Sequence, residues 1–167
     1  MAADNAGAIA VRPVRREDHA QWLALWHAYN VFYGRSWGRN GEPPVEPEVT
    51  AAAWARFFDD SQPLWALVAA EASAGGDEGR LLGFTHYLFH LGTNFIQPLC
   101  YLEDLFTVEA ARGRGVGRAL IQAVCDAAQA AGSARVYWQT HESNATARRL
   151  YDRVAERPGF IIYQRDL

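Results

Sequence analysis

The sequence predicts an α/β fold in which a mixed, mostly antiparallel central sheet is flanked by helices. Segments with strand and helix patterns follow one another in the order β-α-α-β-β-β-α-β-α-β, which is typical of this class. The length of 167 residues is about that of one domain. No repeat or linker divides the chain, and half of its residues are apolar, which is enough to bury a core. We therefore expect residues 1–167 to form one domain.

The N-terminal part is expected to contribute two strands and two helices. Alternating residues at 9–14 predict a strand, and Asp18 could cap a helix whose apolar positions continue to Tyr29. Glycine, proline and charged residues at 34–47 indicate a loop. A helix at 49–58 and a strand at 64–70 are expected next.

Residues 81–102 form a run of 22 without a formal charge, which is long enough to raise the question of a membrane span. The run contains His86, His90 and Pro98, and Gly92-Thr93-Asn94 has the composition of a turn. We therefore expect a hairpin of two strands, at 81–89 and 99–108. The first residues have neither a basic nor an apolar region, so no signal peptide is predicted.

The clearest element is a helix that begins after a glycine-rich turn. Apolar residues at positions 116, 120, 123, 124, 127 and 131 share one helical face, and Gly132 is a stop signal. A strand at 135–140, a helix capped by Ser143 or Asn144, and a closing strand at 160–164 are expected to complete the fold.

The charged residues exclude several functions. All 16 basic residues are arginine, so chemistry that requires a lysine is excluded: Schiff bases, Walker A loops and protein kinases. Residues 1–111 carry seven Arg and fourteen acids, whereas residues 112–167 carry nine Arg and five acids. This asymmetry indicates two differently charged surfaces. With a net charge of −3, the chain is not expected to bind nucleic acid.

A glycine-rich loop lies between an expected strand and an expected helix. A helix N-terminus offers free N–H groups to an anion, glycines let the backbone approach it, and arginine donors suit phosphate oxygens. The dinucleotide fingerprint needs a third glycine where Arg118 stands, and the P-loop lysine is missing. The loop therefore indicates either a pyrophosphate site or a turn that joins two elements. Its sequence is Arg112-Gly113-Arg114-Gly115-Val116-Gly117-Arg118.

Two further motifs flank this loop. Tyr101-Leu102-Glu103-Asp104-Leu105-Phe106-Thr107-Val108 precedes it, and Thr140-His141-Glu142-Ser143-Asn144 and Leu150-Tyr151 follow. The combination resembles the GNAT superfamily of acetyl-CoA-dependent N-acetyltransferases, closest to the diamine acetyltransferase and small histone-acetyltransferase-like branch. The resemblance covers most of the chain and is weak before residue 64. It implies a single GNAT-like domain in which a splayed strand pair forms the acetyl-CoA cleft.

The resemblance also implies how acetyl-CoA (CoA) would be bound, with no metal involved. The loop would bind the pyrophosphate through backbone N–H groups. The freed backbone groups of Phe106 and Val108 in the preceding strand would bind the pantetheine arm. Asn144 would contact the same arm, although a simple helix cap also explains this residue. The implied cofactor-binding residues are Phe106, Thr107, Val108, Arg112, Gly113, Arg114, Gly115, Val116, Gly117, Arg118 and Asn144.

Two residues are implied to be catalytic. Tyr151 would protonate the departing thiolate, and Glu103 would deprotonate the acceptor amine through ordered water. The alternatives are a core aromatic for Tyr151 and a surface carboxylate for Glu103, while His141 is a second candidate base. Asp104 should point to the opposite face of a regular strand from Glu103 and should not share its role.

The expected function is direct transfer of acetyl from acetyl-CoA to a primary amine of a small molecule, such as a polyamine or an amino acid. The alternatives are acetylation of protein lysines or N-termini, and a non-catalytic CoA-binding module. Two cysteines without metal-ligand spacing indicate reduced thiols and a cytoplasmic protein. No membrane partner is expected. A homodimer is implied by the resemblance, with the apolar residues 160–163 available for contact.

Overall fold

A five-stranded sheet is the centre of the fold in this computed structural model, which describes residues 8–35, 43–72 and 79–167. The strands are β1 (Ile9–Pro13), β2 (Leu64–Glu71), β3 (Leu81–His90), β4 (Leu99–Thr107) and β5 (Arg135–Tyr137). They lie side by side in chain order, antiparallel from β1 to β4 and parallel between β4 and β5. The sheet is therefore mixed and mostly antiparallel, as the sequence predicts.

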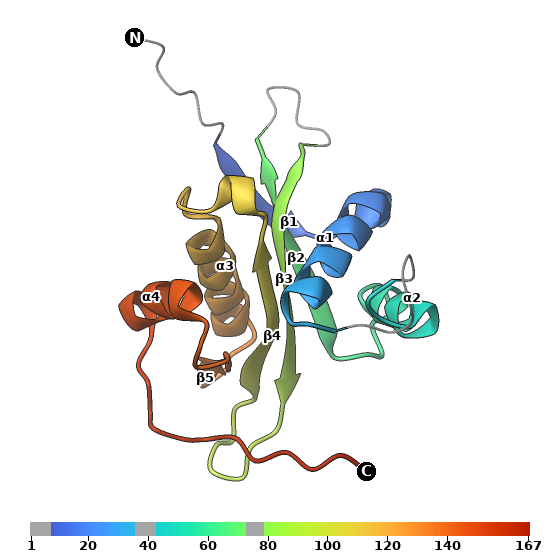
Figure 1. The fold of residues 1–167 in the computed structure, drawn as a ribbon. Coiled ribbons are helices and arrows are strands. Elements are labelled where there is room, and N and C mark those ends of the chain that lie inside the picture. Colours follow the sequence, from blue (N-terminus) through green and yellow to red (C-terminus); the bar gives the residue numbers. More distant parts are fainter. Residues whose placement is uncertain (1–7, 36–42, 73–78) are drawn as a thin grey trace.

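Helices cover both faces of the sheet (Figure 1). On one side lie α1 (His19–Phe32) and α2 (Pro47–Arg56), and on the other lie α3 (Val116–Ala130) and α4 (Ala145–Val154). Short 3₁₀ turns occupy Arg16–Asp18 and Glu109–Ala111. The described residues thus form the α/β fold expected from the pattern of elements.

Two apolar clusters hold the layers together. The cluster on the α3 side contains Leu120 and Val124, which the helical spacing places on the face of α3 that contacts the sheet. The cluster on the α1 side contains Trp22, Trp26 and Phe84, and Trp22 and Phe84 are completely buried. These large aromatic rings fix how α1 lies on the sheet.

The uncharged run at 81–102 forms the predicted hairpin of β3 and β4. Its pairing shifts at one point: His86 pairs with Asp104, but Tyr87 pairs with Leu102, so Glu103 has no partner on β3. Such a β-bulge inserts one residue and bends the strand. The bulge lies in the middle of the segment that the sequence singles out for function.

The bulge corrects one expectation about the two acids. Leu102 and Leu105 both pack against the cluster on the α3 side, so the two residues between them face the α1 side. Asp104 confirms this placement because it contacts Tyr29 of α1. The expectation that Glu103 and Asp104 point to opposite faces is therefore wrong, since it assumed a regular strand.

The strands β4 and β5 separate soon after they meet. They pair only through Leu99–Tyr101 and Arg135–Tyr137, and β4 continues to Thr107. In the described part of the chain, residues 102–107 thus have no neighbouring strand on the β5 side. This is the splayed pair that the resemblance implies, and it makes β5 shorter than the expected 135–140.

The expected closing strand at 160–164 is not formed. Residues 156–167 contain neither helix nor strand, and the side chains of Phe160, Ile161, Ile162 and Tyr163 are 63–89% exposed. In Figure 1 this segment runs away from α4 and passes the lower end of the sheet. An apolar run favours a strand, but a strand also needs a partner for its backbone groups, and here it pairs with none of the described strands.

Candidate active site

A cleft of about 1000 Å³ opens where β4 leaves β5. Its walls are the C-terminal ends of α1 and β4, the loop from Ala111 to Arg118, and the segment from His141 to Arg153. The predicted loop, Asn144 and Tyr151 are thus brought to one cavity, although they are far apart in the sequence. These motifs therefore contribute to one site, whereas Glu103 and Val108 are not among the residues that line the cleft.

The glycine loop has the shape of an anion cradle. Gly113 and Gly115 have φ angles of 80° and 88°, in the left-handed region that disfavours side chains. Added Cβ atoms at these positions would meet no atom within 4 Å, so the backbone here faces open space. Gly115 caps α3, and the first N–H that bonds back into the helix is that of Ala119, to the Gly115 carbonyl. The N–H groups of residues 116–118 therefore remain for a ligand.

The three arginines of the loop are placed differently. Arg112 and Arg118 are both exposed to solvent and line the cleft. Arg114 forms an ion pair with Glu71 at the end of β2, at 3.2 Å between Nη1 and Oε1. Part of its charge is therefore already committed within the protein.

The strand residues expected to bind the pantetheine arm differ in which backbone groups are free. The N–H of Val108 donates to the Leu82 carbonyl at 2.9 Å, and its carbonyl accepts from Ala111 at 3.0 Å. Because backbone direction alternates in an antiparallel pair, Phe106 also directs its groups to β3, whereas Leu105 and Thr107 direct theirs to the splay. Phe106 and Thr107 both line the cleft. The expected backbone role fits neither Phe106 nor Val108, whose groups are directed to β3, and it fits Leu105 and Thr107 instead.

Asn144 is the N-cap of α4. Its Oδ1 accepts from the Ala147 N–H at 3.3 Å, and its Nδ2 donates to Thr140 Oγ1 at 3.3 Å. The alternative of a helix cap is therefore realised, and a contact with the cofactor stays a prediction. His141 lies nearby in an exposed turn, where its Nδ1 is 2.6 Å from Ser143 Oγ.

Tyr151 lines the cleft, and its side chain is half-buried. Its ring packs edge-on against Trp138, with 5.4 Å between centroids. Burial, and secondarily the neighbouring phenol of Tyr33 at the end of α1, raise the pKa of Tyr151 to about 12. The phenol is therefore fully protonated at neutral pH, the state that a proton donor must have.

Glu103 stands at the bulge with an exposed side chain. Although the side chain reaches solvent, the protein around its carboxyl group removes part of its hydration. This desolvation and the negative charge of Asp104 raise the pKa of Glu103 above its usual value, against the opposing effect of the Arg35 guanidinium. A raised pKa makes a carboxylate a stronger base, which suits removal of a proton from an amine. Its role as the base stays a prediction.

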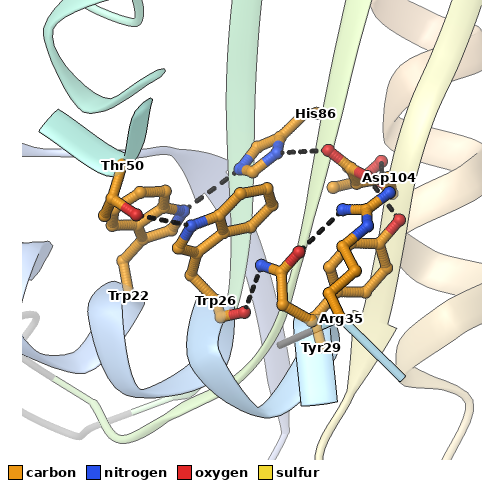
Figure 2. Close-up of polar contacts among 9 residues, drawn as sticks. Trp22, Trp26, Tyr29, Arg35, Thr50, His86 and Asp104 are labelled. Atoms are coloured by element: carbon orange, nitrogen blue, oxygen red, sulfur yellow. Dashed lines mark hydrogen bonds and ion pairs between the residues drawn. The ribbon is translucent and has the colours of Figure 1, made fainter. Parts of the chain in front are cut away.

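Behind Glu103 lies a chain of hydrogen bonds, which we call the buried polar network: Trp22, Tyr29, His86 and Asp104 (Figure 2). The indole N–H of Trp22 donates to His86 Nε2 at 3.1 Å, and His86 Nδ1 lies 2.8 Å from Asp104 Oδ2. An indole can only donate, so Nε2 accepts and the imidazole proton is on Nδ1, directed at Asp104. The hydroxyl of Tyr29 donates to the other carboxylate oxygen.

The buried polar network holds Asp104 as an anion. Burial alone would raise the pKa of this carboxyl group, but the interaction with His86, the hydrogen bond from Tyr29 and the positive charge of Arg35 together lower the pKa below its usual value. Its carbonyl oxygen also accepts from Thr85 Oγ1 at 2.8 Å. Hydrogen bonds therefore hold both the backbone carbonyl and the side chain of Asp104, and Asp104 in turn anchors the bulge that contains Glu103.

Sequence reasoning missed this network because its members are far apart in the chain. One signal was available: His86 and Asp104 are polar residues within expected buried strands, where polar groups need partners. Tyr29, Tyr33 and Arg35 carried no sequence signal, since the end of a helix and the following loop have no chemistry-bearing motif.

Other kinds of site find little support in the described residues. No group of three or more His, Cys, Asp or Glu side chains that could hold a metal ion occurs among them. Within the same residues, no helix has both the length and the apolar character needed to cross a bilayer. The cysteines Cys100 and Cys125 are both free thiols.

Comparison with known proteins places the fold and the cleft in context. The family model described as the Acetyltransferase (GNAT) family matches residues 18–155. The D-amino-acid N-acetyltransferase HPA3 of Saccharomyces cerevisiae is 34% identical over 158 residues, covering 95% of this chain and 91% of the yeast protein. YhfO of Bacillus subtilis, described as an uncharacterized N-acetyltransferase, is 27% identical, with 92% and 94% covered.

Solved structures share the architecture at low identity. The aminoglycoside N-acetyltransferase AAC(6')-Iy in complex with CoA superimposes with a TM-score of 0.74 at 17% identity, covering 99% of each chain. The ribosomal-protein-alanine N-acetyltransferase of Brucella melitensis biovar Abortus has a TM-score of 0.72 at 18% identity, covering 96% of this chain and all of that one. The family match, the yeast relative and the cleft geometry agree: the chain belongs to the GNAT family and is an N-acetyltransferase.

Proposed function

We propose that the protein transfers the acetyl group of acetyl-CoA to a primary amine of a small molecule. The observation that carries this proposal is the single cleft that contains both the glycine cradle at the N-terminus of α3 and Tyr151. An anion-binding end and a protonated phenol in one cavity suit a long, phosphorylated thioester. Glu103 lies on β4, two residues before Leu105, where the strand begins to line the cleft.

The residues present fit acetyl-CoA. The left-handed glycines and the free N–H groups of α3 suit its diphosphate, and the backbone groups of Leu105 and Thr107 at the splay suit its amide-bearing arm. When bound, it supplies an acyl thioester, which a neutral amine can attack without a covalent enzyme intermediate.

The chain's residues then have two tasks. Glu103, through ordered water, takes a proton from the ammonium form of the acceptor, because only the neutral amine has a lone pair for attack. As the carbon–sulfur bond breaks, the hydroxyl of Tyr151 donates its hydrogen to the departing sulfur. The ammonium nitrogen loses two protons in all: Glu103 takes one before attack, and the second leaves as the amide forms and restores the hydroxyl of Tyr151 through water. The sulfur keeps the proton from Tyr151, the acetyl group moves to nitrogen, and Glu103 gives its proton to solvent.

A small acceptor is supported by the yeast relative, which is a D-amino-acid N-acetyltransferase. Acetylation of protein lysines or N-termini is the competing function. The diamine acetyltransferase branch stays a prediction, since the comparisons support the family and not this branch.

The test is an acceptor panel. The purified protein is mixed with acetyl-CoA and amino acids, polyamines, aminoglycosides or basic peptides, and the released thiol is followed with a thiol reagent. We expect thiol release with at least one small amine. Release with basic peptides alone would favour the protein substrate, and tight CoA binding without release would favour a non-catalytic module.

We also propose that the protein is a cytoplasmic homodimer. Two free cysteines are consistent with a reducing compartment. The exposed apolar residues 160–163 suit contact with a second copy, because monomers rarely expose such a contiguous apolar segment.

A further inference from the structure

Arg35 is an exposed cation that the fold holds near two carboxylates, those of Glu103 and Asp104. Its Nη1 donates to Asn30 Oδ1 at 2.7 Å, and Nδ2 of the completely buried Asn30 donates to the Trp26 carbonyl at 2.7 Å. Its guanidinium also lies over the Tyr29 ring, 5.8 Å from the centroid. Figure 2 shows Arg35 in front of Tyr29 and next to Asp104. An arginine anchored in this way loses little further side-chain freedom when it binds a ligand.

The charge of Arg35 helps to keep Asp104 ionised, but this does not use its hydrogen-bond donors. Both carboxylate oxygens of Asp104 already accept hydrogen bonds, one from His86 and one from Tyr29. The Arg35 guanidinium has five N–H groups, and among the described residues it makes one hydrogen bond, to Asn30 Oδ1. The backbone N–H of Arg35 separately donates to the Asn30 carbonyl at 3.0 Å. The charge of Arg35 also acts on the exposed Glu103, where it opposes the rise in the pKa of that carboxyl group.

The position of Arg35 connects it to the reacting end of the cleft. The Tyr29 ring, over which Arg35 lies, contacts the Tyr33 ring at 4.9 Å between centroids. Tyr33 lines the cleft and is the neighbour that acts on the phenol of Tyr151. Arg35 does not itself line the cleft, but two aromatic rings, Tyr29 and Tyr33, link it to Tyr151.

This pair of opposite charges matches a zwitterion. An α-amino acid carries a carboxylate and an ammonium on one carbon atom, so one acceptor could contact a guanidinium and a carboxylate at once. Guanidinium and carboxylate form paired, charge-assisted hydrogen bonds. A polyamine has no carboxylate for Arg35 to bind, and its second ammonium group would be repelled by the guanidinium.

We propose that Arg35 binds the carboxylate of an α-amino acid acceptor while Glu103 receives its ammonium group, so that the site selects amino acids over polyamines. The proposal rests on the proposed acetyl transfer to a small amine and names its substrate class. Arg35 is thus the residue that determines specificity, and Asn30 positions it.

The experiment compares acceptors that differ only in the carboxylate. Acetyl transfer to both enantiomers of alanine and phenylalanine, to the corresponding amino-acid amides, and to putrescine is measured by thiol release. The variants are Arg35→Gln and, as a control that removes one exposed arginine from α2, Arg56→Gln. The acetyl-CoA KM is measured for each variant as a check on the integrity of the cofactor cleft.

We expect the wild-type kcat/KM for an amino acid to exceed that for its amide and for putrescine. Arg35→Gln should lower the ratio of amino acid to amide roughly 10- to 100-fold, the size expected for loss of a charge-assisted hydrogen bond. Arg56→Gln should leave the ratio as in the wild type. An unchanged ratio in Arg35→Gln, or equal loss with both acceptors, would overturn the proposal.

Failure of the broader function gives a different result. If the wild-type protein releases no thiol with any small amine, the proposed acetyl transfer itself is wrong. If putrescine is the best wild-type acceptor, small-amine transfer stands and the role of Arg35 is refuted. A folding defect in Arg35→Gln would appear as a changed thermal midpoint of unfolding. In that case Arg35→Lys, which keeps the charge but not the paired donors, would be measured instead. Its ratio of amino acid to amide should lie between those of the wild type and Arg35→Gln.

Discussion

Tyr151 combines two properties that a donor to sulfur needs: it lines the cleft and it holds its proton. The raised pKa of about 12 means that ionisation of this phenol does not limit activity near neutral pH. Its hydroxyl is therefore available throughout the working range, although a phenol of this pKa is a weak acid that acts only as the sulfur becomes negative.

Tyr151→Phe should lower kcat about 10²- to 10⁴-fold, the range for loss of a general acid, and leave the affinity for acetyl-CoA within about threefold of the wild type. The ring contact with Trp138 is kept, so the fold should not change. Steady-state kinetics and CoA titration by calorimetry measure the two effects. Unchanged kcat would show that Tyr151 is only a packing residue.

Asp104 offers a second test, because its fixed negative charge acts on Glu103 from the adjacent position. The charged and titratable groups around Glu103 are Asp104, Arg35, Tyr101 and Tyr137. The Asp104 charge makes Glu103 harder to ionise and so raises its pKa. Removing that charge should lower the pKa of Glu103.

In Asp104→Asn, the acid limb of the kcat profile should move to lower pH. Activity requires ionised Glu103 and rises as pH passes its pKa, so a lower pKa moves this rise downward. The control is Glu103→Gln, in which the limb should disappear. A limb that does not move in Asp104→Asn, or that moves upward, would contradict the coupling between the two acids.

At the scale of elements, the approach of β3 to β4 depends on one glycine. A Cβ added to Gly83 would lie 2.3 Å from the carbonyl oxygen of Phe106 and 3.3 Å from the Cα of Thr107. Both are backbone atoms within the ladder, so the strands would have to move apart. The strand that would move is β4, whose other edge separates from β5 and lines the cleft.

Gly83→Ala should therefore destabilise the protein by about 1–3 kcal/mol, the usual effect of overpacking, and raise the KM for acetyl-CoA. Gly117→Ala is the comparison: its Cβ would meet Leu150 Cδ2 at 3.1 Å, a side-chain atom that can move. Urea unfolding of both variants measures the difference. Equal stability losses would mean that the closeness of β3 and β4 is not what Gly83 provides.

The elements also show what could be predicted from sequence. Helix α3 and the β3–β4 hairpin follow from local periodicity and turn residues, and the cleft follows from motifs that flank them. The bulge at Glu103 could not be predicted, because it depends on contacts between Asp104 and residues 18 and 75 positions earlier. The prediction of a strand at 160–164 is wrong for a related reason, because the local pattern does not show whether a partner strand exists.

At the scale of the molecule, the segment after α4 is exposed and has no regular secondary structure. Four consecutive residues from Phe160 to Tyr163 leave large apolar side chains in water. Burying such side chains against a second copy is favourable in proportion to the apolar area removed from water. The segment is therefore expected to hold the proposed dimer together.

Deleting residues 159–167 should convert the dimer to a monomer, as measured by light scattering after size exclusion at tens of micromolar. The matched control removes only residues 164–167, which follow the apolar stretch, and should remain dimeric. A wild-type protein that is monomeric at this concentration would refute the dimer. Dimers of all three forms would place the contact elsewhere.

The buried polar network also constrains how this sequence can change over evolution. Losing any one of the four members, Trp22, Tyr29, His86 or Asp104, would leave a partner buried without its hydrogen bond, which costs about 1–3 kcal/mol for a neutral group and more for a charged one. Replacing all of them with apolar residues of similar size could be nearly neutral for stability. Descendant lineages should therefore keep these positions together or exchange them together. A lineage that exchanged them would need another way to hold the bulge under Glu103.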